Sequence, residues 1–126
     1  MGRVERLAAE LHQRWVRQRG YATRLVEDER GGHIDLASTP FAALPAAWQE
    51  ENLAAARSAL WAVAATSDVT DPEQRVEAVA ALVHESWVKR NAARDAPDEL
   101  LVSYARLAEE ERGKDRVIAV LALSCD

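Results

Sequence analysis

The sequence predicts an all-α domain built from two copies of one helical unit, with a short β-hairpin in the first connection. Residues 3–19 and 75–91 both place apolar residues at helical spacing, and the two segments resemble each other. The chain is 48% hydrophobic and 29% charged, an ordinary balance for a folded domain. We therefore expect a single domain over 1–126, with unit 1 at about 3–67 and unit 2 at about 72–123.

The first helix of each unit has clear boundaries in the sequence. The apolar face of residues 3–19 consists of Val4, Leu7, Ala8, Leu11 and Trp15. The corresponding face of residues 75–91 consists of Val76, Val79, Ala80, Val83 and Trp87. Gly20 follows the first helix and predicts its end. Asp71 and Pro72 precede the second helix and predict its start, as a capping residue and a first helical residue.

The two helices align at an offset of 72 residues. Eight identical pairs support this alignment: Arg3/Arg75, Val4/Val76, Glu5/Glu77, Ala8/Ala80, Ala9/Ala81, His12/His84, Trp15/Trp87 and Val16/Val88. Unrelated amphipathic helices would share their apolar positions, but they would not share a histidine and a tryptophan three residues apart. The sequence therefore predicts an internal repeat.

The repeat extends into the second half of each unit at an offset of 63 residues. The matching pairs are Phe41/Tyr104, Leu44/Leu107 and Asn52/Asp115. Each half leads into a further helix, through about residue 67 in unit 1 and residue 123 in unit 2. The first connection is nine residues longer, and its residues 21–26 predict a strand of a hairpin that turns at Gly31 and Gly32. We expect the units to share one core about a pseudo-twofold axis.

Composition argues against several functions. The net charge of -5 provides no basic stripe for nucleic acid, and no apolar run approaches the ~20 residues that span a bilayer. The single Cys125 allows no disulfide within the chain, which favours a cytoplasmic protein. His33 lies in the variable connection, so we find no metal-binding cluster, and no catalytic motif is present. We expect neither an enzyme nor a cofactor.

The motifs of both units resemble the RyR repeat, the domain named after the ryanodine receptor. Unit 1 has LAAELHQRW at residues 7–15, RGY at 19–21 and FAALP at 41–45, followed by Asn52. Unit 2 has VHESW at residues 83–87 and LVSY at 101–104, followed by Leu107 and Asp115. Ser103 replaces the proline that the family places before the aromatic residue. The resemblance covers about residues 4–66 and 76–121.

This resemblance implies a stand-alone module associated with nucleotide signalling. In the family the two repeat tryptophans sandwich an adenine base, and these correspond to Trp15 and Trp87. The basic residue four positions later corresponds to Arg19 in unit 1 and is replaced by Asn91 in unit 2. The polar residue after the aromatic corresponds to Asn52 and Asp115. The further candidate ligand-binding residues are Tyr104, His12 and His84.

Each of these residues also has a purely structural interpretation. The tryptophans lie on apolar faces and could be core residues, and the histidines could be buried rings bonded to a backbone carbonyl or to a side chain of the other unit. We expect Trp61 in the core and Trp48 partly exposed at a contact surface. The first functional hypothesis is therefore a non-enzymatic sensor or sequestering module for a nucleotide-derived small molecule, adenine-containing molecules included, bound between the units. The alternative is a protein-interaction module or a homodimer without a small ligand.

Overall fold

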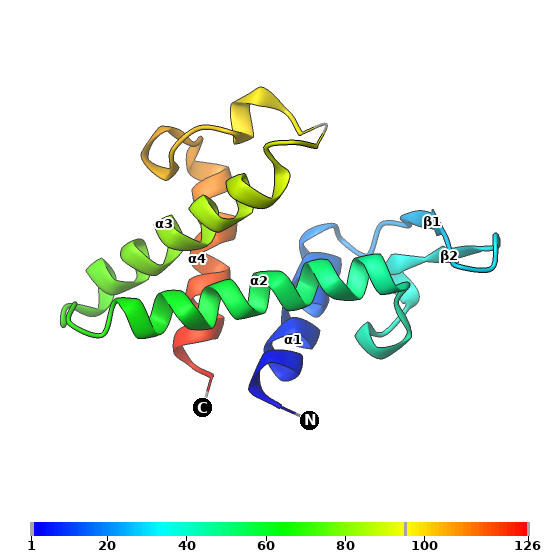
Figure 1. Ribbon diagram of the computed structural model, residues 1–126, viewed down its shortest axis with the longest axis horizontal. Coiled ribbons are helices and arrows are strands. Elements are labelled where there is room, and N and C mark those ends of the chain that lie inside the picture. The colour runs from blue at the N-terminus through cyan, green and yellow to red at the C-terminus, as the bar shows by residue number, and fades with distance from the viewer. Residues whose placement is uncertain (1, 95, 126) are drawn as a thin grey trace. The chain divides into compact units, whose positions relative to one another are not determined.

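The computed structural model describes residues 2–94 and 96–125. In this part of the chain, four α-helices and a two-stranded antiparallel sheet account for the regular structure, together with four 3-10 turns, η1 to η4 (Figure 1). The prediction of an all-α fold with one short hairpin is confirmed. The chain divides into two compact units, unit 1 at Met1–Ala56 and unit 2 at Arg57–Asp126.

Unit 1 begins with helix α1, Arg3–Gln18, which ends where the sequence predicts. Gly20 and Tyr21 both adopt a φ of 62°, a left-handed conformation that terminates the helix. The hairpin follows as β1, Leu25–Glu27, and β2, His33–Asp35, with Val26 opposite Ile34. The expected strand at residues 21–26 therefore starts four residues later, because Tyr21 still belongs to the end of the helix.

The hairpin leads into two 3-10 turns, η1 (Leu36–Ser38) and η2 (Phe41–Ala43). Asp35 starts the first turn, since its carboxylate accepts a hydrogen bond from the Ala37 amide at 3.1 Å. Helix α2, Ala46–Ala65, follows directly and continues past the end of unit 1 into unit 2.

Unit 2 contains α3 (Pro72–Asn91), η3 (Asp98–Leu100), η4 (Tyr104–Arg106) and α4 (Glu109–Leu123). The Asp71 carboxylate caps α3 by accepting from the Gln74 amide at 2.9 Å, as the sequence predicts. Arg75 on α3 donates to the Val63 carbonyl at 2.9 Å and so satisfies an acceptor in the last turn of α2. Helix α3 packs along α4 (Figure 1).

The buried residues are mainly those that helical periodicity predicts. Leu11 and Val83, in the middle of the two predicted faces, are 7% and 4% exposed. The other large apolar side chains that are buried are Leu7, Val16, Leu36, Leu44, Val79 and Leu107. The expectation that Trp61 lies in the core is wrong, because 60% of its surface is exposed. Helix α2 buries alanines instead, at Ala56, Ala59 and Ala62.

The two units contain closely matched local structure. Turns η2 and η4 begin 63 residues apart, at Phe41 and Tyr104, and helices α2 and α4 begin at Ala46 and Glu109, the same distance apart. The residues that end the turns, Leu44 and Leu107, have φ, ψ values of -66°, 150° and -67°, 151°. In the described residues no helix combines the length and apolar character needed to cross a bilayer.

Candidate ligand-binding site

In unit 1 the His-x-x-Trp motif forms a fixed pair of rings. His12 is 5% exposed and its Nε2 lies 2.7 Å from the Thr39 carbonyl oxygen, just before η2. Since a carbonyl only accepts, Nε2 carries the proton of this hydrogen bond. The His12 ring stacks on Trp15 with 6.0 Å between centroids and 20° between planes. Trp15 is itself half-buried, so one part of its ring reaches the surface.

Unit 2 repeats this arrangement with its own residues. His84 is 5% exposed and donates from Nε2 to the Val102 carbonyl oxygen at 2.6 Å. Its ring stacks on the half-buried Trp87 at 6.0 Å and 15°. The acceptors Thr39 and Val102 are 63 residues apart, like the turns that follow them. The sequence interpretation of the histidines as buried rings bonded to carbonyls is therefore confirmed.

The two tryptophans differ in what covers them. The Arg19 guanidinium lies over the Trp15 ring, 4.9 Å from its centroid, which is a cation–π contact. The corresponding residue in unit 2 is Asn91, whose side-chain amide donates to the Trp87 carbonyl at 2.8 Å. Asn91 is therefore bonded to its own helix.

Asn52 and Asp115 occupy matching positions but have different partners. Asn52 donates to the Trp48 carbonyl at 2.9 Å, four residues earlier in α2. Asp115 places Oδ2 3.6 Å from His84 Nδ1, which is longer than a good hydrogen bond and forms an ion pair only when the histidine is protonated. Burial raises the pKa of Asp115 to about 6, although the nearby His84 opposes this rise. The carboxylate thus remains charged at neutral pH in a place that disfavours its charge.

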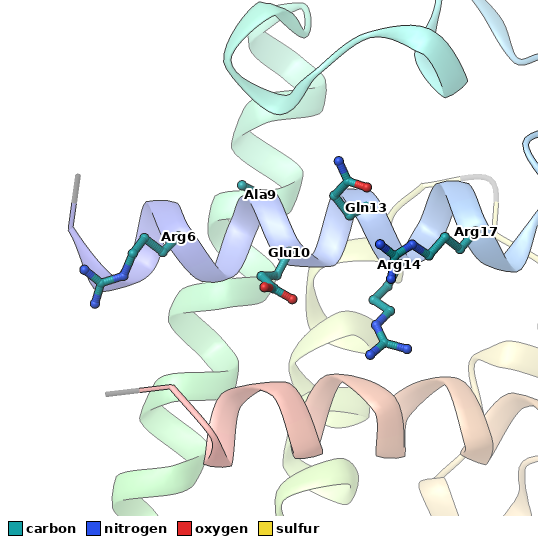
Figure 2. A pocket seen from close by; sticks show the side chains of 6 residues that line it. All are labelled: Arg6, Ala9, Glu10, Gln13, Arg14 and Arg17. Atoms are coloured by element: carbon teal, nitrogen blue, oxygen red, sulfur yellow. The ribbon is translucent and has the colours of Figure 1, made fainter.

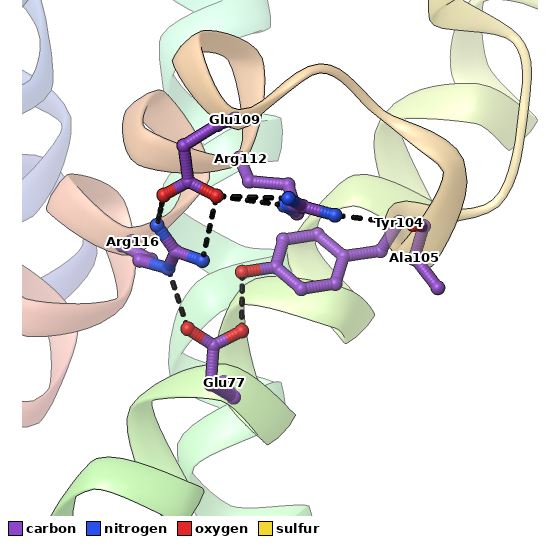
Figure 3. A network of polar contacts seen from close by, with 6 residues as sticks. All are labelled: Glu77, Tyr104, Ala105, Glu109, Arg112 and Arg116. Carbon is purple, nitrogen blue, oxygen red and sulfur yellow. Dashed lines mark hydrogen bonds and ion pairs between the residues drawn. The ribbon is translucent and has the colours of Figure 1, made fainter.

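Tyr104 belongs to a polar network that ties η4 to α3 and α4 (Figure 3). Its hydroxyl donates to the Glu77 carboxylate at 2.6 Å, and Arg116 donates to the same carboxylate. Arg116 also pairs with Glu109, which in turn accepts from Arg112 at 2.8 Å. Arg112 donates to the Ala105 carbonyl at 3.1 Å and closes the network on the η4 backbone.

The network also sets the charge states of its members. Burial, followed by the bond to Glu77, raises the pKa of Tyr104 to about 12. The same bond, reinforced by Arg116, lowers the pKa of Glu77. Arg116 and Arg112 lower the pKa of the exposed Glu109 to about 2. At neutral pH the tyrosine is therefore a neutral donor and both carboxylates are charged acceptors.

A pocket of about 580 Å³ lies on the exposed side of α1 (Figure 2). Its charged lining residues are Arg6, Glu10, Arg14 and Arg17. The Arg14 and Arg17 side chains lie near each other, whereas Arg6 points toward the other end of the helix (Figure 2). The helix that carries Trp15 therefore presents a basic surface within an acidic protein.

The structure brings together only some of the residues that the sequence singles out. His12, Trp15 and Arg19 form one cluster, and His84 with Trp87 and Asp115 forms another. Asn52 and Asn91 bond to backbone carbonyls of their own helices. Sequence reasoning missed the partners Thr39, Val102, Glu77 and Arg116. The shared offset of 63 could have indicated the two carbonyls, but nothing in the sequence marks Glu77 as the partner of Tyr104.

We compared the chain with protein-family models, curated proteins and solved structures, and none of the three comparisons gave a match.

Proposed function

We propose that this chain is a non-enzymatic binding module for a nucleotide-derived small molecule, with Trp15 in unit 1 and Trp87 in unit 2 each serving as a ring on which a base stacks. The proposal retains the sequence hypothesis, including its resemblance to the RyR repeat.

One observation carries the proposal: a histidine–tryptophan pair of the same geometry occurs in each unit. In both pairs a hydrogen bond to a carbonyl fixes the histidine, and the stacked histidine supports a tryptophan that keeps an exposed part. A base that stacks on a ring requires the ring to be partly exposed and rigidly held, and both tryptophans have an exposed part and a stacked histidine beside them. Stacking of a base on such a ring stabilises binding by ~1 to 3 kcal/mol.

The arginines of unit 1 favour an anionic ligand. Arg14 and Arg17 project from the helix that carries Trp15, and Arg19 lies over the ring itself. A base that stacks on the covered face must displace Arg19, which costs about 0.5 to 1 kcal/mol at an exposed site. The displaced guanidinium can then pair with a phosphate. Among the described residues no cation lies over the Trp87 ring, so a base alone should bind to unit 2 more readily than to unit 1.

Calorimetric titration and thermal shift with adenosine, AMP, ATP, dinucleotides and cyclic nucleotides test the proposal. A ligand at 100 times its dissociation constant should raise the free energy of unfolding by about 2.7 kcal/mol. Trp15→Ala and Trp87→Ala should each weaken binding about 5- to 150-fold, which corresponds to the stacking energy. Arg19→Ala should weaken ATP binding but leave adenosine binding equal or stronger.

Trp61→Ala is the matched control. It removes a tryptophan that is 60% exposed and lies outside both motifs, so nucleotide affinity should not change. Circular dichroism must first show that each variant is folded. Equal affinity in the wild type and in both motif variants would contradict the proposal, as would the absence of binding to any nucleotide in the panel.

The exposed Trp61 favours a second candidate, a protein-interaction module that forms a homodimer. Monomeric proteins expose single apolar side chains commonly, but tryptophan is enriched at protein interfaces. Sedimentation of the wild type and of Trp61→Ala over a range of concentrations tests this candidate. A dimer that the substitution dissociates would support it, and a wild type that stays monomeric would rule out self-association through this residue.

A further inference from the structure

Unit 2 contains a second cavity, of about 460 Å³, between α3 and the segment that leads into η4. Ala81 and Val88 line it from the helix, and Leu101, Val102 and Ala105 line it from the segment. This volume lies within the range of pockets that bind small molecules. The described lining contains no tryptophan, although it includes His84, whose ring stacks on Trp87.

The wall of this cavity is held at three points by side chains. His84 donates to the Val102 carbonyl at 2.6 Å, and the Tyr104 hydroxyl donates to Glu77 at 2.6 Å. Arg112 donates to the Ala105 carbonyl at 3.1 Å, as Figure 3 shows. These bonds fix residues 102–105 without a ligand, so a ligand would not have to order the wall when it binds.

The polar groups of the lining fall into two classes. His84 Nε2 and the Tyr104 hydroxyl are already occupied by Val102 and Glu77. The carboxylate of Glu85 and the hydroxyl of Ser103 also line the cavity, and neither makes a hydrogen bond or ion pair with any described residue. Both residues are exposed and lie at the rim. The cavity therefore offers apolar walls, one uncompensated negative charge and one hydroxyl.

We propose that this cavity binds a small organic amine, with its hydrocarbon or aromatic part between α3 and residues 101–105 and its ammonium group at Glu85. Burial of the apolar part supplies the affinity, since apolar surface leaves water. The carboxylate supplies selectivity for a cation, and Ser103 accepts a hydrogen bond from the ammonium. Binding involves no covalent step.

Titration of the full chain with 2-phenylethylamine, followed by amide chemical shifts, tests the proposal. Residues 81–88 and 101–105 should shift with the amine, and the isosteric acid 3-phenylpropionate should bind more weakly. Because an exposed ion pair is weak, Glu85→Gln should reduce the affinity for the amine by about two- to fivefold. The same variant should abolish the preference for amine over acid.

Glu73→Gln is the matched control, because it removes one exposed charge from the same helix outside the cavity. It should retain the preference for the amine. Val88→Trp should fill the cavity and abolish the shifts. If Val88→Trp does not fold, Glu85→Gln still tests the proposal, because Glu85 is exposed and its substitution should not affect folding. Absence of shifts at the cavity at millimolar amine would overturn the proposal, and so would equal binding of amine and acid by the wild type.

Discussion

In each unit a 3-10 turn is hydrogen-bonded to the helix that follows it, η2 to α2 and η4 to α4, but the two units use different side chains for these bonds. In unit 1, Gln49 donates to the carbonyls of Phe41 and Ala42 at 3.2 and 3.0 Å. At the matching position 63 residues later, Arg112 donates to the Ala105 carbonyl and also pairs with Glu109. A neutral amide thus does in unit 1 what an ion-pair network does in unit 2. The backbone arrangement is common to both units, while the electrostatics are specific to each.

The largest expected effect tests whether the two matching turns contribute equally to the free energy of unfolding. Leu44 and Leu107 follow the two turns and are 5% and 4% exposed. Leu44→Ala and Leu107→Ala should each lower the free energy of unfolding by about 2 to 5 kcal/mol, because each leaves a cavity in the core. Urea denaturation measures both values. A nearly neutral result in one unit would show that the turns are not equivalent in packing.

A second pair of variants exchanges the residues at the matched polar position. The raised pKa of Asp115 means that the folded state disfavours its charge. Its cost is fully present above pH 6 and disappears as the pH falls toward the ordinary value of 3.8. Asp115→Asn should therefore stabilise the protein at pH 7 by about 1 to 3 kcal/mol and have little effect at pH 4.

The reverse exchange serves as the comparison. Asn52→Asp replaces an amide that donates to the Trp48 carbonyl with a group that only accepts, so it should destabilise by about 1 kcal/mol at pH 7. Carboxylates with lowered pKa values, such as Glu77, contribute stability that is lost as the pH falls. The contribution of Asp115 is therefore measured as the difference in free energy of unfolding between the wild type and Asp115→Asn at each pH. A difference that grows as the pH falls would contradict the burial argument.

A third pair concerns the aromatic residue of each turn. Tyr104→Phe removes a hydroxyl that donates to the charged Glu77 and makes unit 2 resemble unit 1. It should cost about 1 kcal/mol, less than for a buried bond, because the site is partly exposed. Phe41→Tyr should be nearly neutral, since most surface changes stay within about 0.5 kcal/mol. Thermal denaturation of the two variants side by side checks the contrast.

The last comparison concerns the residues at which the first helix of each unit begins. Asp71 caps α3 with its side chain, whereas α1 begins at Gly2 without a side-chain cap. Asp71→Ala should lower stability by about 1 kcal/mol, and Asp71→Asn should retain most of it because asparagine also caps well. If both variants lost the same amount, the charge of Asp71 rather than the capping bond would be responsible.

Local signals made much of the fold predictable. Gly20 and Asp71 mark helix ends, and helical periodicity identified Leu11 and Val83 as buried. The prediction failed at Trp61 because the preference of tryptophan for burial is an average, and the buried face of this helix consists of alanines. The Glu77–Tyr104 pair was not predictable either, since residues 27 positions apart meet only in the folded unit. The pseudo-twofold relation between the units remains a prediction.

The two histidine–carbonyl bonds have a practical consequence. An imidazole N–H proton that is bonded to a carbonyl and 5% exposed exchanges with water only when its surroundings open. His12 therefore reports the opening of the turn in unit 1, and His84 reports the same event in unit 2. Exchange rates of these two ring protons would give two local opening free energies from a single sample. Equal values would indicate that the two turns open in one cooperative event, and different values would indicate that they open separately.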